Sequence, residues 1–321
     1  MKVRDAKVGK IKYCQICNST NLEKIVELGF SGLCDSLLTK KDLDSFEKSF
    51  PLNLFRCKIC QLLQLNYVVD NREVFHSNYP YKSGITSPLK KYLHNISSYA
   101  VKNFNFSENP LAVDIGSNDG TLLEGFKYNN FKVLGVEPTN IAKIANKKGI
   151  KTIQSFFDIY TARNIKKRFT KAEVITGTNI FAHVNKLDSF MRGVKLILNP
   201  KNGIFVTESH YAVDIVNKLQ FDSVYHEHLR FFLLKPLIKL MQMYGFKIID
   251  AVRIPNYGGS LRVAATLNSK MPVKKSVINI LNMEKNKNFY SSNKYKKFSK
   301  DVFKVKKELL NILWSLKLKK K

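Results

Sequence analysis

Tyr225, His226, Glu227 and His228 are consecutive residues whose side chains could move a proton. A histidine beside a carboxylate can act as a general base near neutral pH, because its neutral imidazole accepts a proton and the nearby negative charge stabilises the cation. His183 is a second imidazole, earlier in the chain. We expect acid–base chemistry if the fold brings these groups to one site.

Two other interpretations of this cluster are open at the level of sequence. His226, Glu227 and His228 could bind a metal, although no further cluster of ligands is evident. They could also be ordinary structural residues that form hydrogen bonds, and the same holds for His183. The choice depends on the elements that position these side chains.

Those elements follow the pattern of an α/β sheet, in which apolar strands alternate with helical segments and the sheet is mostly parallel. The segment with His183 follows the fourth predicted strand, and the segment 221–228 follows the fifth. The carboxyl ends of parallel strands share one edge, where ligands bind. The last two strands, joined through Asn256–Gly259, are predicted to form an antiparallel edge. The predicted strands lie near residues 111–115, 131–136, 150–154, 172–176, 203–208, 247–254 and 260–266.

The turn after the first predicted strand indicates a nucleoside-containing cofactor. Asp114 ends that strand and Gly116 opens the turn, while Glu137 ends the next strand. An acid at the end of the second strand of such a sheet accepts hydrogen bonds from the two hydroxyls of a ribose. A glycine-rich turn that binds nothing is the alternative.

The details of the turn favour a cationic ligand over a pyrophosphate. A dinucleotide site needs Gly-x-Gly-x-x-Gly, but Asn118 replaces the second glycine and Asp119 adds a carboxylate before Gly120. That carboxylate would repel a pyrophosphate and would suit the amino-acid end of S-adenosylmethionine. The turn resembles motif I of the class I methyltransferases.

The cysteines form a second strong motif. Cys14 and Cys17 make one pair with a two-residue gap, and Cys57 and Cys60 make another. Such pairs can direct four thiolates at one metal ion, so we predict a closed structural Zn²⁺ site. Cys34 is left over and is predicted to be a buried small side chain.

Composition limits the choice of partner and compartment. The chain has 321 residues and a formal net charge of +29, but only nine of its 54 basic residues are Arg. The lysines are spread along the whole chain, so we interpret them as a solvated surface and consider nucleic-acid binding unlikely. The N-terminus has no apolar signal core, and charges and a proline interrupt the longest apolar stretch, 231–246. We therefore predict a soluble, cytoplasmic protein with no membrane partner.

The chain is divided into three predicted regions. Residues 1–70 form a zinc-binding domain, residues 71–268 a domain that binds S-adenosylmethionine, and residues 269–321 a helical, Lys-rich segment. The apolar cluster 309–316 near the end of this segment needs something to pack against. Either it docks on the preceding domain, or its partner is missing.

Taken together, the motifs resemble one family, the zinc-containing sugar C-methyltransferases. The resemblance covers essentially residues 12–316. Members of this family act on nucleotide-linked 4-keto deoxysugars and install a methyl branch at C3. The order of motifs that carries the resemblance is the two Cys pairs, Tyr79–Gly84, Val113–Gly120, Asn179–Val184, Phe221–His228 and Gly258–Val263.

The resemblance implies roles for individual residues. His228 would be the base that removes the proton next to the keto group, with Glu227 orienting it. Tyr225 and His183 would contact the sugar and its developing oxyanion. Tyr79 or Tyr81 would close over the site. The cofactor would be held by Asp114, Gly116, Asn118, Asp119, Gly120, Glu137, Asn179 and Ser83, and Zn²⁺ by Cys14, Cys17, Cys57 and Cys60.

The resemblance also implies a departure. Members of the family continue into a third, Rossmann-like domain that helps to bind the nucleotide sugar, so this chain is predicted to be truncated after a helical start. Two other functions are open: an RNA methyltransferase with a zinc ribbon, and a cofactor-binding remnant without activity. The sequence leaves open which sugar and nucleotide are used and what the oligomeric state is.

Overall fold

The computed structural model describes residues 3–75, 80 and 82–319. A seven-stranded sheet with the order β12-β13-β10-β9-β6-β7-β8 forms its centre. The strands from β10 to β8 are parallel, and β13 is antiparallel to both of its neighbours. The predicted α/β sheet with an antiparallel edge is therefore confirmed. The strands are β6 (Leu111–Ile115), β7 (Lys132–Val136), β8 (Thr152–Ile153), β9 (Val174–Thr178), β10 (Ile204–His210), β12 (Lys247–Ile254) and β13 (Ser260–Thr266).

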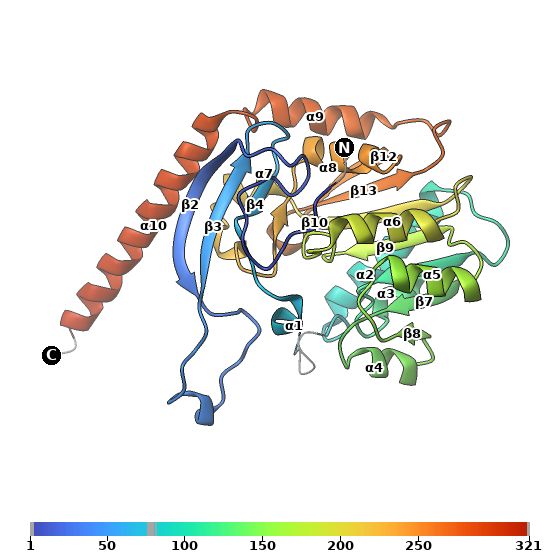
Figure 1. The fold of residues 1–321 in the computed structure, drawn as a ribbon, viewed down its shortest axis with the longest axis horizontal. Coiled ribbons are helices and arrows are strands. Elements are labelled where there is room, and N and C mark those ends of the chain that lie inside the picture. Colours follow the sequence, from blue (N-terminus) through green and yellow to red (C-terminus); the bar gives the residue numbers. More distant parts are fainter. Residues whose placement is uncertain (1–2, 76–79, 81, 320–321) are drawn as a thin grey trace.

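Helices cover both faces of this sheet (Figure 1). Alternate residues of β6 point to opposite faces, so Val113 lies in one core cluster and Ala112 in the other. Side chains of α2 (Ser87–Asn103) and α3 (Thr121–Lys127) belong to the cluster of Ala112. Side chains of α5 (Ile159–Arg168), α6 (Leu187–Ile197) and α8 (Leu234–Met243) belong to the cluster of Val113. The remaining short elements are α1 (Asn71–Val74), α4 (Ala142–Lys147), α7 (Ala212–Asn217), η1 (Lys40–Asp42), η2 (Phe221–Ser223) and η3 (Asn256–Gly258).

The N-terminal region forms a second sheet, with the order β11-β4-β3-β2. Its fourth strand, β11, comes from far along the chain and pairs with β4, with Arg230 opposite Gln64 and Phe231 opposite Leu63. The segment that follows His228 is therefore part of the sheet that carries the cysteines. The strands of this region are β1 (Gly9–Lys10), β2 (Leu22–Ser31), β3 (Phe50–Cys57), β4 (Leu63–Leu65), β5 (Tyr67–Val68) and β11 (Arg230–Phe231), and β1 pairs with β5.

Two helices end the chain, α9 (Lys275–Asn286) beside β12 and the long α10 (Ser292–Leu318). Tyr295, Phe298 and Val302, in the first half of α10, are buried in the same core cluster as β2 and β3. The second half projects away from the body of the molecule (Figure 1). The apolar cluster predicted to need a partner is exposed there: Leu309, Leu310, Ile312, Leu313, Trp314 and Leu316.

One prediction about the N-terminal region is wrong. Cys34 is exposed and not buried. It lies in the segment between β2 and β3, where residues 35–49 are mostly exposed, so no core is available to it.

Candidate active site and metal centre

The four paired cysteines meet in one buried cluster. Their Sγ atoms all lie within 4.8 Å of one another, and the Cys14–Cys60 and Cys17–Cys57 pairs lie 3.4 and 3.5 Å apart. Hydrogen bonding from Cys14 lowers the pKa of the Cys17 thiol to about 6 and also lowers the pKa of Cys57. Four buried thiols at this separation match the donor set of a closed tetrahedral Zn²⁺ site, with no open position for a reacting molecule. The predicted grouping of these cysteines is confirmed.

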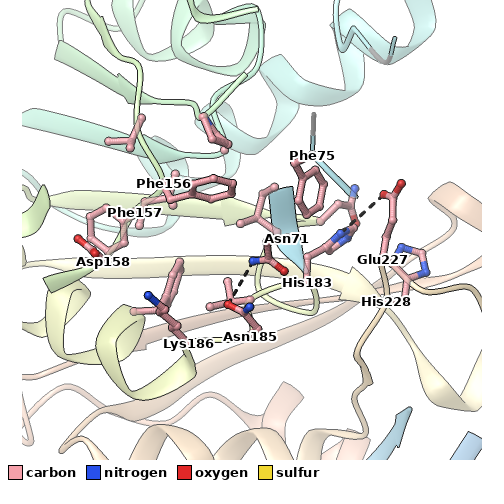
Figure 2. Close-up of a pocket in the computed structure, with 18 of the residues that line it drawn as sticks. Asn71, Phe75, Phe156, Phe157, Asp158, His183, Asn185, Lys186, Glu227 and His228 are labelled. Carbon is pink, nitrogen blue, oxygen red and sulfur yellow. Dashed lines mark hydrogen bonds and ion pairs between the residues drawn. The ribbon is translucent and has the colours of Figure 1, made fainter. Parts of the chain in front are cut away.

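A cavity of about 1360 Å³ lies at the carboxyl ends of the parallel strands. The turn after β6, the end of β7, the segment after β9 and the end of β10 all contribute to its wall. In Figure 2, Phe156 and Phe157 lie on one side of this cavity, and His183, Glu227 and His228 lie on the other. A single cavity is therefore lined by most of the residues predicted for the cofactor and for acid–base chemistry: Ser83, Asp114, Gly116, Asn118, Glu137, Asn179, His183, Tyr225, Glu227 and His228.

The turn after β6 leaves room for a ligand. Gly116 has a φ of +73°, and a Cβ added there would lie 2.2 Å from the Ile180 side chain, so only glycine fits. The side-chain oxygens of Ser117 and Asn179 are buried and have no hydrogen-bond partner among the described residues. Both residues line the cavity. Buried polar atoms without partners are costly, and a polar cofactor such as S-adenosylmethionine would satisfy them.

Two buried carboxylates line the same part of the cavity. Glu137 accepts hydrogen bonds from the Asn118 backbone N–H at 3.1 Å and the Thr139 hydroxyl at 2.7 Å, which fixes it at the end of β7. Burial and, to a smaller extent, the nearby charge of Glu137 raise the pKa of Asp114 to about 7, although a hydrogen bond from Thr176 opposes the shift. The two acids give this end of the cavity the negative charge that a cationic ligand needs.

Of the three remaining predicted cofactor residues, Ser83 lines the cavity, and Asp119 and Gly120 do not. The Asp119 carboxylate contacts the Lys148 ammonium at 3.1 Å and the Thr121 hydroxyl at 2.7 Å, and it is not part of the cavity wall. Gly120 is not part of the wall either; its φ of +81° begins α3. Ser83 lines the cavity, and its backbone N–H donates to Asn118 Oδ1 at 2.8 Å.

The Gly116→Ala variant should bind S-adenosylmethionine at least about tenfold more weakly, because a Cβ at this φ is strained and also displaces Ile180. Isothermal titration calorimetry would measure the change. Gly149→Ala is the matched control, since Gly149 has a φ of +74° but nothing closer than 3.9 Å to the added Cβ. Equal affinities for wild type and Gly116→Ala would contradict this assignment.

The affinity for S-adenosylmethionine should fall by up to about tenfold per pH unit as the pH drops below about 7. In that range Asp114, whose pKa is raised to about 7, takes up a proton and loses the charge that attracts a cation. Titrations between pH 5.5 and 7.5 would show the slope, and Asp114→Asn should flatten it. A wild-type affinity that does not change over this range would exclude the role of Asp114.

His228 has the geometry of a neutral imidazole whose two nitrogens differ in role. Its Nδ1 lies 2.9 Å from the Ser223 carbonyl oxygen, which can only accept, so Nδ1 carries the proton. Its Nε2 therefore accepts a hydrogen bond from the Tyr225 hydroxyl at 3.0 Å. Burial lowers the pKa of His228 well below its usual value, and the neighbouring His183 and His210 lower it further. The ring is thus neutral at pH 7.

His183 and Glu227 complete the cluster. The rings of His183 and His228 meet edge to face with centroids 4.8 Å apart. The Glu227 Oε2 atom lies 4.0 Å from His183 Nδ1, as the dashed line in Figure 2 shows. Burial lowers the pKa of His183 to about 3, with His210 and Arg230 contributing in the same direction. The site therefore holds two buried, neutral imidazoles.

Sequence reasoning missed several residues of the cavity wall. His210, at the end of β10, lies 4.7 Å from His228 between ring centroids, and Tyr257 lies 5.9 Å from His210. Phe156 and Phe157 follow β8 directly. The available signal was position, because each of His210, Phe156 and Phe157 comes just at or after the carboxyl end of a strand.

The predicted metal interpretation of the segment 226–228 and the predicted tyrosine lid remain to be compared with the structure. His226 is buried beside Phe50 of β3, with ring centroids 5.8 Å apart, and it is not part of the cavity wall. Across residues 3–75, 80 and 82–319, the four cysteines are the only group of three or more metal-ligating side chains close enough to bind one ion. The metal interpretation of His226, Glu227 and His228 therefore has no support. Tyr79 and Tyr81 lie outside the described residues.

Three models of protein families match the chain in sequence. The model described as "Putative zinc binding domain" matches residues 14–75. The one described as "Methyltransferase domain" matches residues 90–251, half of the chain. The one described as "C-methyltransferase C-terminal domain" matches residues 255–321. The S-adenosylmethionine cofactor and the zinc-binding domain are thereby supported together with the four-cysteine cluster.

The chain is also similar to individual proteins. It is 28% identical over 308 residues to the C-methyltransferase NovU of Streptomyces niveus, covering 95% of this chain and 73% of NovU. The PH0226 protein of Pyrococcus horikoshii OT3 has a TM-score of 0.45 at 12% identity, covering 61% of this chain and 98% of that one. A S-adenosylmethionine-dependent methyltransferase of Thermotoga maritima has a TM-score of 0.42 at 19% identity, covering 56% and 91%.

The prediction that the chain lacks the C-terminal domain of the family is wrong. The family model of that domain matches residues 255–321, which include β13, α9 and α10. The sequence argument placed the strand 260–266 in the preceding domain and interpreted residues 269–321 as only the start of a C-terminal domain. In the structure, α9 lies beside β12 and α10 packs against β2.

Among the helices of the described residues, none combines the length and the apolar character needed to span a lipid bilayer.

Proposed function

We propose that this chain methylates the carbon next to the keto group of a nucleotide-linked 4-keto deoxysugar. The chain belongs to the family of S-adenosylmethionine-dependent methyltransferases. The C-methyltransferase matches support transfer to carbon. The observation that carries the proposal is the neutral His228 imidazole, because its Nε2 lone pair lies in the cavity that also contains the cofactor turn. Methylation of carbon needs a base of this kind, since the carbon must first lose a proton.

In this proposal His228 Nε2 accepts the proton from the substrate carbon. The C–H electron pair moves into the keto group, which becomes an enolate. The Nδ1–H bond to the Ser223 carbonyl, 2.9 Å long, holds the ring in the tautomer that can accept this proton. The pKa of His228 lies well below its usual value in the buried pocket, so the base is ready in its neutral form at neutral pH.

Tyr225 and His183 are suited to stabilising the enolate oxygen. The Tyr225 hydroxyl, which donates to His228 Nε2 in this structure, turns away to leave that lone pair to the substrate proton, and it then donates to the keto oxygen as negative charge develops there. His183 has a pKa of about 3, so it acts as a neutral hydrogen-bond donor. Glu227, predicted to orient His228, instead lies 4.0 Å from His183 Nδ1, and the Ser223 carbonyl orients His228.

S-adenosylmethionine supplies an electrophilic methyl group when it is bound. The residues that would hold it are those of the cavity wall near the turn after β6. Asp114 and Glu137 offer carboxylates, and Gly116 lets the backbone approach closely. Ser117 and Asn179 offer the buried oxygens without partners among the described residues.

The test is a methyl-transfer assay with thymidine- and uridine-linked 4-keto deoxysugars and S-adenosylmethionine. Mass spectrometry should show one added methylene, and NMR should place the new methyl group on the carbon next to the keto group. With S-adenosylhomocysteine in D₂O instead, the wild-type protein should exchange the hydrogen on that carbon for deuterium. The 4-hydroxy analogues are the control, because their ring hydrogens are not acidic. Neither transfer nor exchange with any 4-keto sugar would refute this proposal.

A further inference from the structure

Gln15, the residue after Cys14, connects the first cysteine pair to the candidate catalytic loop, which is the segment 224–229 that contains His228. The Gln15 side chain is fully buried. Its Nε2 donates to the Leu65 carbonyl at 3.2 Å and to the Leu229 carbonyl at 3.4 Å. Leu229 is the residue after His228, so one side chain joins the metal-binding turn to the position next to the proposed base.

The backbone makes the same connection. The Gln15 N–H donates to Gln64 Oε1 at 2.8 Å, and Gln64 in β4 lies opposite Arg230 in β11. The Leu65 N–H donates to the Leu229 carbonyl at 3.0 Å. The end of the loop that carries His228 is therefore hydrogen-bonded to the strand that follows the second cysteine pair. A shift of the cysteine turns would move that loop.

Arg230 makes a second connection, in this case to His183. Its side chain is almost completely buried, and its Nη1 donates to the Val184 carbonyl at 2.6 Å. Val184 is the residue after His183. The Nε and Nη2 atoms of Arg230 have no hydrogen-bond partner among the described residues. A buried guanidinium is costly unless a negative charge lies nearby.

A loaded metal centre would supply such a charge. Burial lowers the pKa of Arg230 to about 9, and the charges of Cys14 and, less strongly, of Asp5 act in the opposite direction. Four thiolates around Zn²⁺ carry a net negative charge, whereas four neutral thiols carry none. The loaded metal centre thus stabilises Arg230 in the position from which it holds Val184.

We infer that the first cysteine pair positions His228 and His183 through Gln15 and Arg230, so that the metal site sets the geometry of the reaction centre without taking part in the reaction. The inference rests on the proposed role of these histidines as base and oxyanion donor. Gln15 and Arg230 are positioning residues, since neither lines the cavity. A displaced base slows the chemical step, while the cofactor turn after β6 is built on other strands.

The test compares Gln15→Ala and Arg230→Lys with Arg56→Lys. Arg56 is the matched control, because it is a buried arginine of the same sheet that contacts Glu23, Ser292 and Gln61, beside the second cysteine pair, and not the catalytic loop. All proteins are checked for one bound zinc per chain and for S-adenosylmethionine affinity. The readouts are the imidazole ¹⁵N chemical shifts of His228 and His183, and kcat and KM with the keto sugar.

In Gln15→Ala and Arg230→Lys we expect shifted ¹⁵N signals of the two histidines and a kcat lowered by roughly 10- to 100-fold, with KM and cofactor affinity nearly unchanged. Arg56→Lys should match wild type. If Arg230→Lys does not fold, Gln15→Ala decides. Wild-type ¹⁵N signals in a zinc-loaded Gln15→Ala protein would overturn the inference, and so would an equal loss in Arg56→Lys. The ¹⁵N readout needs no substrate, so a wrong choice of sugar would show separately, as a wild-type protein without turnover.

Discussion

Replacing His228 with Ala should lower the rate of methyl transfer by about 10²- to 10⁴-fold, the usual contribution of a general base. The variant loses the Nε2 lone pair that accepts from Tyr225. Deuterium exchange next to the keto group should fall by the same factor, because it requires the same proton transfer. Both rates can be measured on one sample by NMR.

The binding functions should survive this substitution. The cofactor turn and the cysteine cluster do not contain His228, so S-adenosylmethionine affinity and zinc content should equal those of wild type. His94→Ala is a suitable control, since His94 lies on α2 and contacts Glu124, away from the cavity wall. Wild-type exchange in a folded His228→Ala protein would remove the base assignment.

Replacing Cys57 with Ser should lower the melting temperature by at least about 10 °C and release the bound zinc. Structural zinc contributes about 10–16 kcal/mol in small zinc-binding peptides, and each kcal/mol shifts the melting temperature of a chain of this size by roughly 2–4 °C. The loss should be large because the cluster lies in the main core, together with β2, β3 and the first half of α10. Calorimetry and a colorimetric zinc assay would measure both effects.

Cys34→Ser provides the matched control for this experiment. Cys34 is exposed and is not part of the cluster, so its loss should change neither the zinc content nor the melting temperature. Treatment of wild type with a strong chelator should reproduce the behaviour of Cys57→Ser. A wild-type melting temperature in the Cys57 variant would mean that the cluster has no structural role.

The strands of the central sheet could be predicted well from the sequence, for a physical reason. Each is a short apolar run bounded by turn residues, as in Leu111–Ile115 before Gly116, and such runs form buried parallel strands. The four-cysteine cluster could also be predicted, because the two-residue gaps fix the local geometry of each pair. These are signals that a few neighbouring residues carry by themselves.

Features that depend on contacts between distant segments could not be predicted. The pairing of β11 with β4 joins residues far apart in sequence, and a two-residue strand has no periodic signal. The position of Asp119 likewise depends on Lys148, which comes from a later turn. His210 was missed because a single histidine after a strand looks like any structural residue until the neighbouring His228 is placed beside it.

The late position of β11 has a consequence for how the protein is made. Synthesis begins at the N-terminus, so β2, β3 and β4 leave the ribosome long before Arg230 and Phe231 do. Until then the edge of β4 is unpaired, and an unpaired edge can recruit strands of other chains. The nascent chain therefore carries an unpaired strand edge while residues 66–229 are being made, and expression at low temperature with early zinc supply should favour soluble product.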